Sequence, residues 1–210
     1  MNIIDEGLLS KIDGSSEKYE ILHGWDISLS QKCDIQWGSY KLSLYEYIHK
    51  NISDDKIDEM LNSIVMEDNH WNWFSKSVHY KQENYKWFHL IADNEIQGAC
   101  IVYQPKKSFI DQENIFYIEY IAAAPWNRRN LINDKRFNGV GTILLSSISK
   151  FISNNYNFRL GFSLHSLPQA TSYYEKIGMI NYSQNDKSPL KYYEMPETDA
   201  RKIFEVQNDK

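Results

Sequence analysis

The nearly continuous apolar run from Ile115 to Ala124 constrains the fold of this chain more than any other segment. Such a run is typical of a central strand that is covered on both faces. Pro125 ends it, and a polar loop leads to Gly139 and Gly141, after which apolar residues recur at helical spacing. Apolar residues then alternate over 158–164, as in a strand. The order predicts a strand–helix–strand unit whose two strands are parallel and joined by a right-handed crossover.

Weaker patterns precede this unit. The first forty or so residues are polar and irregular, with a short strand expected over 19–22 and helix expected from Leu42. Ser53 is expected to cap a second helix with its apolar face over 57–65, and a third is expected near 70–74.

A hairpin is predicted from 87–92 and 96–103, in which Gly98 indicates a bulge or a close backbone approach. After the unit, Pro168 is expected to open a helix that Gly178 ends in the left-handed conformation. Strands near 179–183 and 191–195 and a short helix after Thr198 close the chain. The predicted fold class is therefore α/β, an α+β arrangement with a mixed, mostly antiparallel sheet around the central parallel unit.

Composition excludes several classes of function. A chain of 210 residues, 42% hydrophobic and 24% charged, is expected to form one domain over 1–210. The net charge of −5 gives no electrostatic reason to expect nucleic acid as the partner. No apolar run reaches the roughly 18 residues of a membrane span, and the N-terminus lacks a signal-peptide pattern. Cys33 and Cys100 suggest neither a disulfide framework nor a metal site. We therefore expect a metal-free cytoplasmic protein. Its oligomeric state is left open, with a homodimer as one alternative.

Gly139 and Gly141 lie one residue apart between the expected strand and helix. Glycines there let the backbone approach a bulky anion, toward which the first N–H groups of the helix and its dipole point. The spacing is not that of a P-loop, because no Lys-Ser/Thr pair follows the second glycine. Taken alone, two glycines are also typical of an ordinary tight turn.

Three segments in order resemble the GCN5-related N-acetyltransferases. Arg136-x-x-Gly139-x-Gly141 is similar to the Q/R-x-x-G-x-G/A motif between the central strand and the following helix of that family. The hairpin over 93–103 is similar to its second and third strands. The segment 170–179, ATSYYEKIGM, is similar to its A-x-x-F-Y-E-K-x-G-F signature. The resemblance covers roughly residues 85–195, which leaves 1–84 as N-terminal helices and an acceptor-side region.

The resemblance implies acetyl-CoA as co-substrate and no metal. In such a protein, the loop backbone holds the pyrophosphate of coenzyme A, and the preceding strand pairs with the pantetheine arm. The cofactor-binding residues expected on this basis are Ile121, Ala122, Ala123, Ala124, Arg136, Phe137, Asn138, Gly139, Val140, Gly141 and Thr142. The sequence departs from the family pattern at two places. Residues 126–135 are inserted before Arg136 and form a lid, an acceptor wall or only a longer surface loop. Leu167 stands where the family often has Asn.

Transfer of an acetyl group to an amine requires a neutral nucleophile and a proton for the departing thiolate. By its position, Tyr174 matches the tyrosine that supplies this proton in the family, and Tyr173 should face elsewhere. Glu119 is an acidic residue in an apolar strand, which is typical either of a base with a raised pKa or of a buried ion pair. His165 is a second candidate base, or a hydrogen-bonded rim residue. The catalytic residues predicted are thus Tyr174 and Glu119.

The expected activity is transfer of an acetyl group from acetyl-CoA to a primary amine of a small-molecule or peptide acceptor by direct attack. One alternative is a catalytically inactive acyl-CoA-binding module that regulates a partner. Another is a toxin-like acetyltransferase acting on aminoacyl-tRNA or protein, although weak basicity argues against tRNA. Trp71, Trp73 and Phe74 either pack in the core or wall an acceptor site through cation–π contact.

Overall fold

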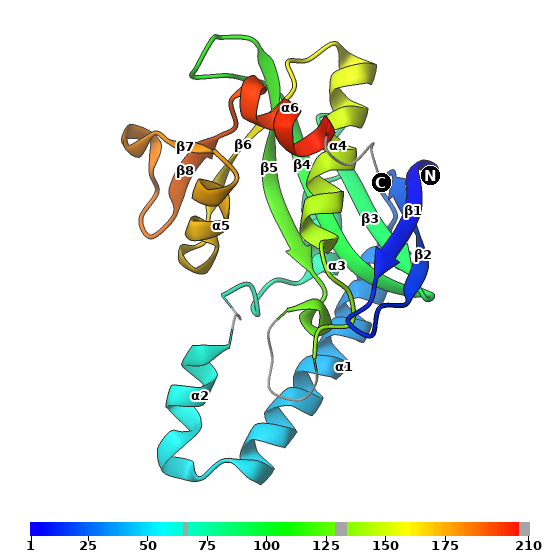
Figure 1. Cartoon of the computed structure of the whole chain (residues 1–210), viewed down its shortest axis with the longest axis vertical. Coiled ribbons are helices and arrows are strands. Elements are labelled where there is room, and N and C mark those ends of the chain that lie inside the picture. Colours follow the sequence, from blue (N-terminus) through cyan, green and yellow to red (C-terminus); the bar gives the residue numbers. More distant parts are fainter. Residues whose placement is uncertain (65–66, 129–133, 206–210) are drawn as a thin grey trace.

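A mixed sheet of eight strands runs through the molecule in the order β1-β2-β3-β4-β5-β6-β8-β7 (Figure 1). The computed structural model describes residues 1–64, 67–128 and 134–205. The strands are β1 (Asn2–Ser10), β2 (Ser16–His23), β3 (Tyr85–Ala92), β4 (Glu95–Lys107), β5 (Asn114–Ala123), β6 (Phe162–Ser166), β7 (Ile180–Asn181) and β8 (Lys191–Glu194). Within the described residues, β5 and β6 are the parallel pair and the other neighbours are antiparallel. The predicted fold class is confirmed.

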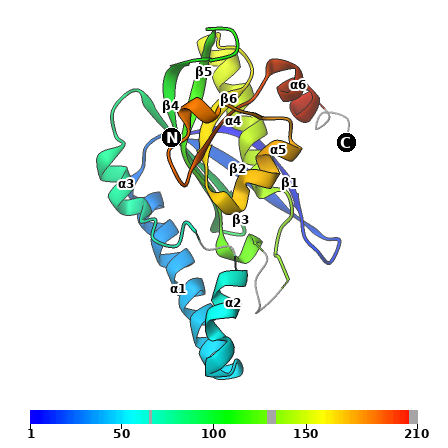
Figure 2. The same cartoon turned by 90° about the vertical axis from the view of Figure 1, so that its left-hand side faces the viewer.

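Helices cover both faces of the sheet (Figures 1 and 2). They are α1 (Ile27–Asn51), α2 (Ile57–Ser63), α3 (Trp73–His79), α4 (Val140–Tyr156), α5 (Thr171–Lys176) and α6 (Glu197–Glu205), with short 3-10 turns η1 (Asp54–Lys56), η2 (Pro125–Asn127), η3 (Pro168–Ala170) and η4 (Ser183–Asn185). The larger core packs α4, α5 and α6 on one face, and the smaller packs α1 and α3 on the other. None of the described helices combines the length and apolarity needed to cross a membrane.

Gly98 on β4 sets how closely α4 approaches the sheet. A Cβ added there would lie 2.6 Å from a methyl group of Leu144 and 3.1 Å from one of Val140. The pairing of β3 with β4 also shifts register here, from Leu90–Gly98 to Ile91–Ile96. Both features expected of this glycine, a bulge and a close approach, are therefore present, and they bring the start of α4 against the sheet.

The N-terminal region is more regular than its sequence indicates. β1 and β2 form a hairpin that extends the sheet beyond the short strand expected over 19–22, and α1 begins well before Leu42. Asp26 caps α1 by accepting hydrogen bonds from the N–H groups of Ser28 and Leu29 at 2.7 and 3.2 Å. Helical periodicity is hard to recognise in α1 because apolar side chains also occupy its exposed face, where Leu42 is 64% exposed.

Other boundaries differ by part of an element. The helix expected over 57–65 ends at Ser63, and position 65 lies outside the described residues. The helix expected near 70–74 is α3, which begins at Trp73. β6 begins at Phe162 rather than 158, because Asn157 and Gly161 adopt positive φ and keep the intervening chain out of the sheet. Gly178 has φ +88°, as predicted for the residue that ends the α5 segment.

Candidate functional site

The parallel strands β5 and β6 separate before either ends. Their last paired residues are Ile118 and Leu164, whereas β5 continues to Ala123. A register shift against β4 between Ile118 and Tyr120 places a bulge at Glu119. From that bulge onward the β6-facing edge of β5 has no strand partner within the described residues. Backbone N–H and C=O groups of this edge can therefore pair with an extended ligand.

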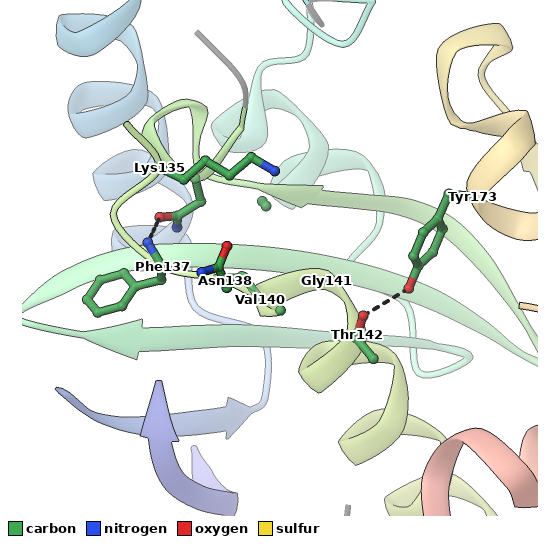
Figure 3. A pocket seen from close by; sticks show the side chains of 10 residues that line it. Lys135, Phe137, Asn138, Val140, Gly141, Thr142 and Tyr173 are labelled. Atoms are coloured by element: carbon green, nitrogen blue, oxygen red, sulfur yellow. Dashed lines mark hydrogen bonds between the residues drawn. The ribbon is translucent and has the colours of Figure 1, made fainter. Parts of the chain in front are cut away.

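The loop before α4 forms a pocket of about 180 Å³ beyond this strand edge (Figure 3). Its lining residues are Ala123, Asn127, Lys135, Phe137, Asn138, Gly139, Val140, Gly141, Thr142 and Tyr173. A Cβ added to Gly139 or Gly141 would meet nothing within 4 Å, and Gly139 has φ +76°. No side chain among the described residues caps α4. The first-turn N–H groups are thus left without a side-chain cap beside an open pocket, which suits the pyrophosphate of coenzyme A.

Arg136 does not line this pocket. Its guanidinium forms an ion pair with Glu95 and lies over the Trp126 ring, 4.9 Å from the centroid. Lys135 is the cation that lines the pocket, on the side of the loop away from Tyr173 (Figure 3). The side chain of the motif arginine thus lies outside this pocket, and the neighbouring lysine, which the sequence analysis missed, lines it.

The loop is held from beneath by a buried polar network that the sequence analysis also missed. The N–H of Phe137 donates to Oδ1 of Asn127 at 3.1 Å, and Nδ2 of Asn127 donates to Oε1 of Gln97 at 2.9 Å. The same Gln97 oxygen accepts from the indole N–H of Trp126 at 2.8 Å. Trp126 and Asn127 belong to the insertion 126–135, so the first residues of that insertion are buried supports of the loop. Its residues 129–133 lie outside the described ones.

The N-terminal hairpin holds the loop from its other side. The N–H of Asn138 donates to the carbonyl of Ser10 at 3.1 Å, and Lys11 forms an isolated β-bridge with Phe137. The Phe137 side chain is buried in the same core as Leu9. The loop expected to bind the cofactor is thus fixed by two distant parts of the chain.

A second pocket of about 180 Å³ follows the free edge of β5 between Ile121–Ala123 and the η3 turn. Arg128 closes one end: its guanidinium forms two hydrogen bonds of 2.5 and 2.6 Å with Asp68 and two more with the carbonyl of Ala123. Burial alone would raise the pKa of Asp68. The hydrogen bonds from Arg128 and its positive charge together outweigh burial, so the pKa of Asp68 lies below its usual range. Glu67 accepts from the N–H of Gln169 at 2.9 Å across the same pocket.

The two tyrosines of α5 have different surroundings. The Tyr173 hydroxyl lies 3.1 Å from Oγ1 of Thr142 and spans from α5 to the start of α4 (Figure 3). Tyr174 is buried, with Cys100 as an electrostatic neighbour, and Cys100 pairs with Ile121 of β5. Burial is the main cause that raises the pKa of Tyr174, so its phenol stays protonated at neutral pH. Tyr173 does face a different way, but toward the loop.

Glu119 is half-buried at the bulge of β5. Burial raises its pKa above the usual range, and the charges of Lys187 and Lys76 oppose that shift. The salt bridges of the described residues do not include Glu119. Its surroundings therefore resemble those of a base more than those of a buried ion pair.

His165 is a hydrogen-bonded rim residue. Its Nε2 lies 2.9 Å from the carbonyl of Asn185, which can only accept, so Nε2 carries the proton. Nδ1 then accepts from the hydroxyl of Tyr117 at 2.7 Å. Nδ1 of His165 is thus already engaged in a hydrogen bond, and burial lowers the pKa of the ring, which fits the rim interpretation. Among the described residues, no group of three His, Cys, Asp or Glu side chains could hold a metal ion.

Fold and site together define an α/β protein with a mixed, mostly antiparallel sheet, in which an open strand edge leads to an uncapped, glycine-rich helix start. No family profile and no curated protein matches the sequence.

The structural neighbours are GCN5-related N-acetyltransferases at low identity. The PaiA N-acetyltransferase of Thermoplasma acidophilum in complex with coenzyme A is 13% identical, with a TM-score of 0.48, over 83% of this chain and 97% of that one. The N-acetyltransferase PseH of Campylobacter jejuni is 14% identical, with a TM-score of 0.43, over 84% and 96%. The aminoglycoside acetyltransferase meta-AAC0020, from an uncultured soil metagenomic sample and in complex with sisomicin, is 14% identical, with a TM-score of 0.42, over 75% and 84%. The likeness concerns the fold alone.

Proposed function

We propose that this chain is an acyltransferase that moves an acetyl group from acetyl-CoA to a primary amine of a small-molecule or peptide acceptor by direct attack. The observation that carries the proposal is the continuity of one surface. The β6-facing edge of β5 from Glu119 to Ala123 has no strand partner among the described residues, although the carbonyl of Ala123 is bound by Arg128, and it leads to the open first turn of α4 at Gly139 and Gly141. Coenzyme A suits this surface, because its extended pantetheine arm fits the strand edge and its pyrophosphate fits the first turn of the helix.

Binding is assigned to the backbone. The edge over 121–124 would pair with the amide groups of pantetheine, and the N–H groups of the first turn of α4 would hold the pyrophosphate. Lys135 adds charge beside these N–H groups. Arg136 and Asn127 keep the loop in shape from outside the pocket.

Proton transfer is assigned to two side chains. The acceptor nitrogen must lose a proton as it forms its bond to the acyl carbon, and Glu119, with its raised pKa, takes that proton directly or through water. The carbon–sulfur bond then breaks, and the departing thiolate takes a proton from Tyr174. Tyr174 lies in the core against which Ile121 packs, which suits the sulfur end of an extended coenzyme, whereas Tyr173 lies beside the first turn of α4, where the pyrophosphate would bind.

Substitution of Gly141 tests the binding site most cleanly. Gly141 lacks the positive φ of Gly139, and a Cβ there meets nothing within 4 Å, so Gly141→Val should fold. Its isopropyl group would occupy the space through which the pyrophosphate approaches. We expect acetyl-CoA to raise the melting temperature of the wild type and not that of Gly141→Val.

Gly38→Val is the matched control, because Gly38 also has open space and lies in α1, outside the loop and its pocket. Normal coenzyme binding by a folded Gly141→Val protein would show that the pyrophosphate does not bind at this loop. Coenzyme binding by a wild type that acetylates no amine or peptide would instead favour the inactive binding module.

A further inference from the structure

An ammonium group lies against two aromatic rings near the point where β5 and β6 separate. Nζ of Lys76, on α3, is 3.4 Å from the ring centroid of Tyr120 and 5.2 Å from that of Trp71. The two rings are nearly perpendicular, with centroids 4.9 Å apart. A cation held this way interacts with the negative faces of both rings. We call Trp71 and Tyr120 the ring pair.

The ring pair adjoins the proposed reaction centre. Tyr120 directly follows Glu119 and lies in the part of β5 that no longer pairs with β6, while it still pairs with Ile101 of β4. Glu119 and Lys76 lie close enough for each charge to act on the other. The hydroxyl of Tyr80 lies 3.2 Å from that of Tyr120 and holds the ring in place. An ammonium between these rings is therefore within electrostatic reach of the carboxylate proposed as the base.

We propose that the ring pair is the acceptor subsite for a primary alkylammonium group, and that Lys76 is its internal occupant, with which the acceptor competes. This inference rests on the proposed acetyl transfer and adds the class of acceptor: an unbranched, lysine-like amine that enters as a cation.

The surroundings also suit the chemistry that follows binding. Burial lowers the pKa of Lys76 to about 8, although Asp34 and Glu119 both oppose the shift. An acceptor ammonium at the same place would experience the same burial. It would be held as a cation and yet release a proton more readily than in water, which a nucleophilic amine requires.

A purely structural role for Lys76 predicts different behaviour. In that case its ammonium only fastens α3 to the sheet, and its removal loosens α3 without creating a binding site. Trp73 and Phe74, also considered as acceptor walls, do not contribute: Trp73 is buried in the smaller core, and Phe74 is exposed on α3.

The test is a ligand-observed NMR titration of the full chain without coenzyme, with n-pentylamine as the probe and 1-pentanol as its uncharged counterpart. Lys76→Met removes the internal ammonium and keeps an unbranched side chain. We expect its Kd for pentylammonium to be roughly tenfold lower than that of the wild type, with little change for pentanol. Lys76→Gln is the second variant if the first folds poorly.

Matched variants separate the cation from the ring. Lys76→Arg keeps a cation between the rings and should show no gain in affinity, and Lys81→Met, at an exposed site, should behave as the wild type. Within Lys76→Met, adding Tyr120→Leu should abolish the gain, whereas adding Tyr120→Phe should retain it because the ring face remains.

An unchanged pentylammonium Kd in both Lys76→Met and Lys76→Gln overturns the inference. An equal gain in affinity for pentanol also overturns it, because it would show that the substitution only created an apolar cavity. Stabilisation of the same preparations by acetyl-CoA is measured separately. Its loss would contradict the proposed function, and its presence without any amine subsite would contradict this inference alone.

Discussion

At the scale of single residues, the two adjacent tyrosines of α5 show how neighbouring positions acquire different chemistry. Tyr174 is buried in the larger core, and Tyr173 reaches the start of α4. Burial raises the pKa of both phenols, so each is a neutral donor near pH 7. Their difference lies in which part of an extended coenzyme each would meet.

We predict that Tyr174→Phe lowers kcat by a factor on the order of 100 or more and leaves the affinity for acetyl-CoA nearly unchanged, because a proton donor acts in the transition state. Tyr173→Phe should instead raise the KM for acetyl-CoA by a few-fold, since its hydroxyl bonds to Thr142 beside the pyrophosphate pocket. A thiol-release assay measures both constants. Equal, small effects on kcat from the two substitutions would rule out Tyr174 as the donor.

A second residue-scale prediction concerns Glu119. Its raised pKa means that burial disfavours the carboxylate in the native state, so Glu119→Gln should be at least as stable as the wild type at neutral pH. The rate, however, should fall and lose the part of its rise with pH that follows the carboxyl titration. A pH–rate profile and a thermal melt on the same protein measure both effects. A normal profile with a lower melting temperature would make Glu119 a structural ion pair.

At the scale of elements, the close approach of α4 to β4 positions the cofactor loop. A larger side chain at Gly98 would displace α4, because Leu144 and Val140 leave no room for it. We predict that Gly98→Val costs about 1–3 kcal/mol of stability and weakens acetyl-CoA binding as well. Denaturant unfolding and coenzyme-induced thermal shifts measure these effects.

Gly38→Ala is the control at this scale. It lies in α1, where a Cβ has open space, and should stabilise the protein by about 0.5–1 kcal/mol without affecting coenzyme binding. If Gly98→Val bound acetyl-CoA as the wild type does, the link between α4 packing and the loop would be refuted.

The elements also show which parts of the structure could be predicted from sequence. β5, α4 and the Gly139–Gly141 turn follow from local patterns: an apolar run, a helical stripe and two glycines. The separation of β5 from β6 does not, because it depends on a one-residue bulge at Glu119 and on where the pairing stops. The side chains that hold the loop, Asn127 and Gln97, meet only through tertiary contact.

At the scale of the whole molecule, burial of His89 makes stability depend on pH. His89 is fully buried on β3, and neither ring nitrogen has a hydrogen-bond partner among the described residues. Burial lowers its pKa to about 4, with Asp26 opposing. As the pH falls below about 6.5, the unfolded state therefore binds a proton that the native state does not, and stability decreases with falling pH until about 4.

We predict that this group alone removes about 2 kcal/mol of stability between about pH 7.5 and about pH 5. His89→Leu should reduce the loss by that amount, and His79→Leu, at an exposed position, should leave it unchanged. Denaturant unfolding at the two pH values gives the difference. An identical loss in His89→Leu and the wild type would show that His89 is charged in the native protein or that other groups dominate.

The hairpin at the start of the chain shares hydrogen bonds with the loop that is proposed to hold coenzyme. Ser10 and Lys11 are joined to Phe137 and Asn138, so the hairpin tip helps to hold the loop in its shape. By thermodynamic linkage, the free energy by which the closed hairpin strengthens coenzyme binding equals the free energy by which bound coenzyme stabilises the hairpin against local opening. Coenzyme bound at the start of α4, in the middle of the sheet, is therefore expected to protect the first strand, at its edge, from local opening.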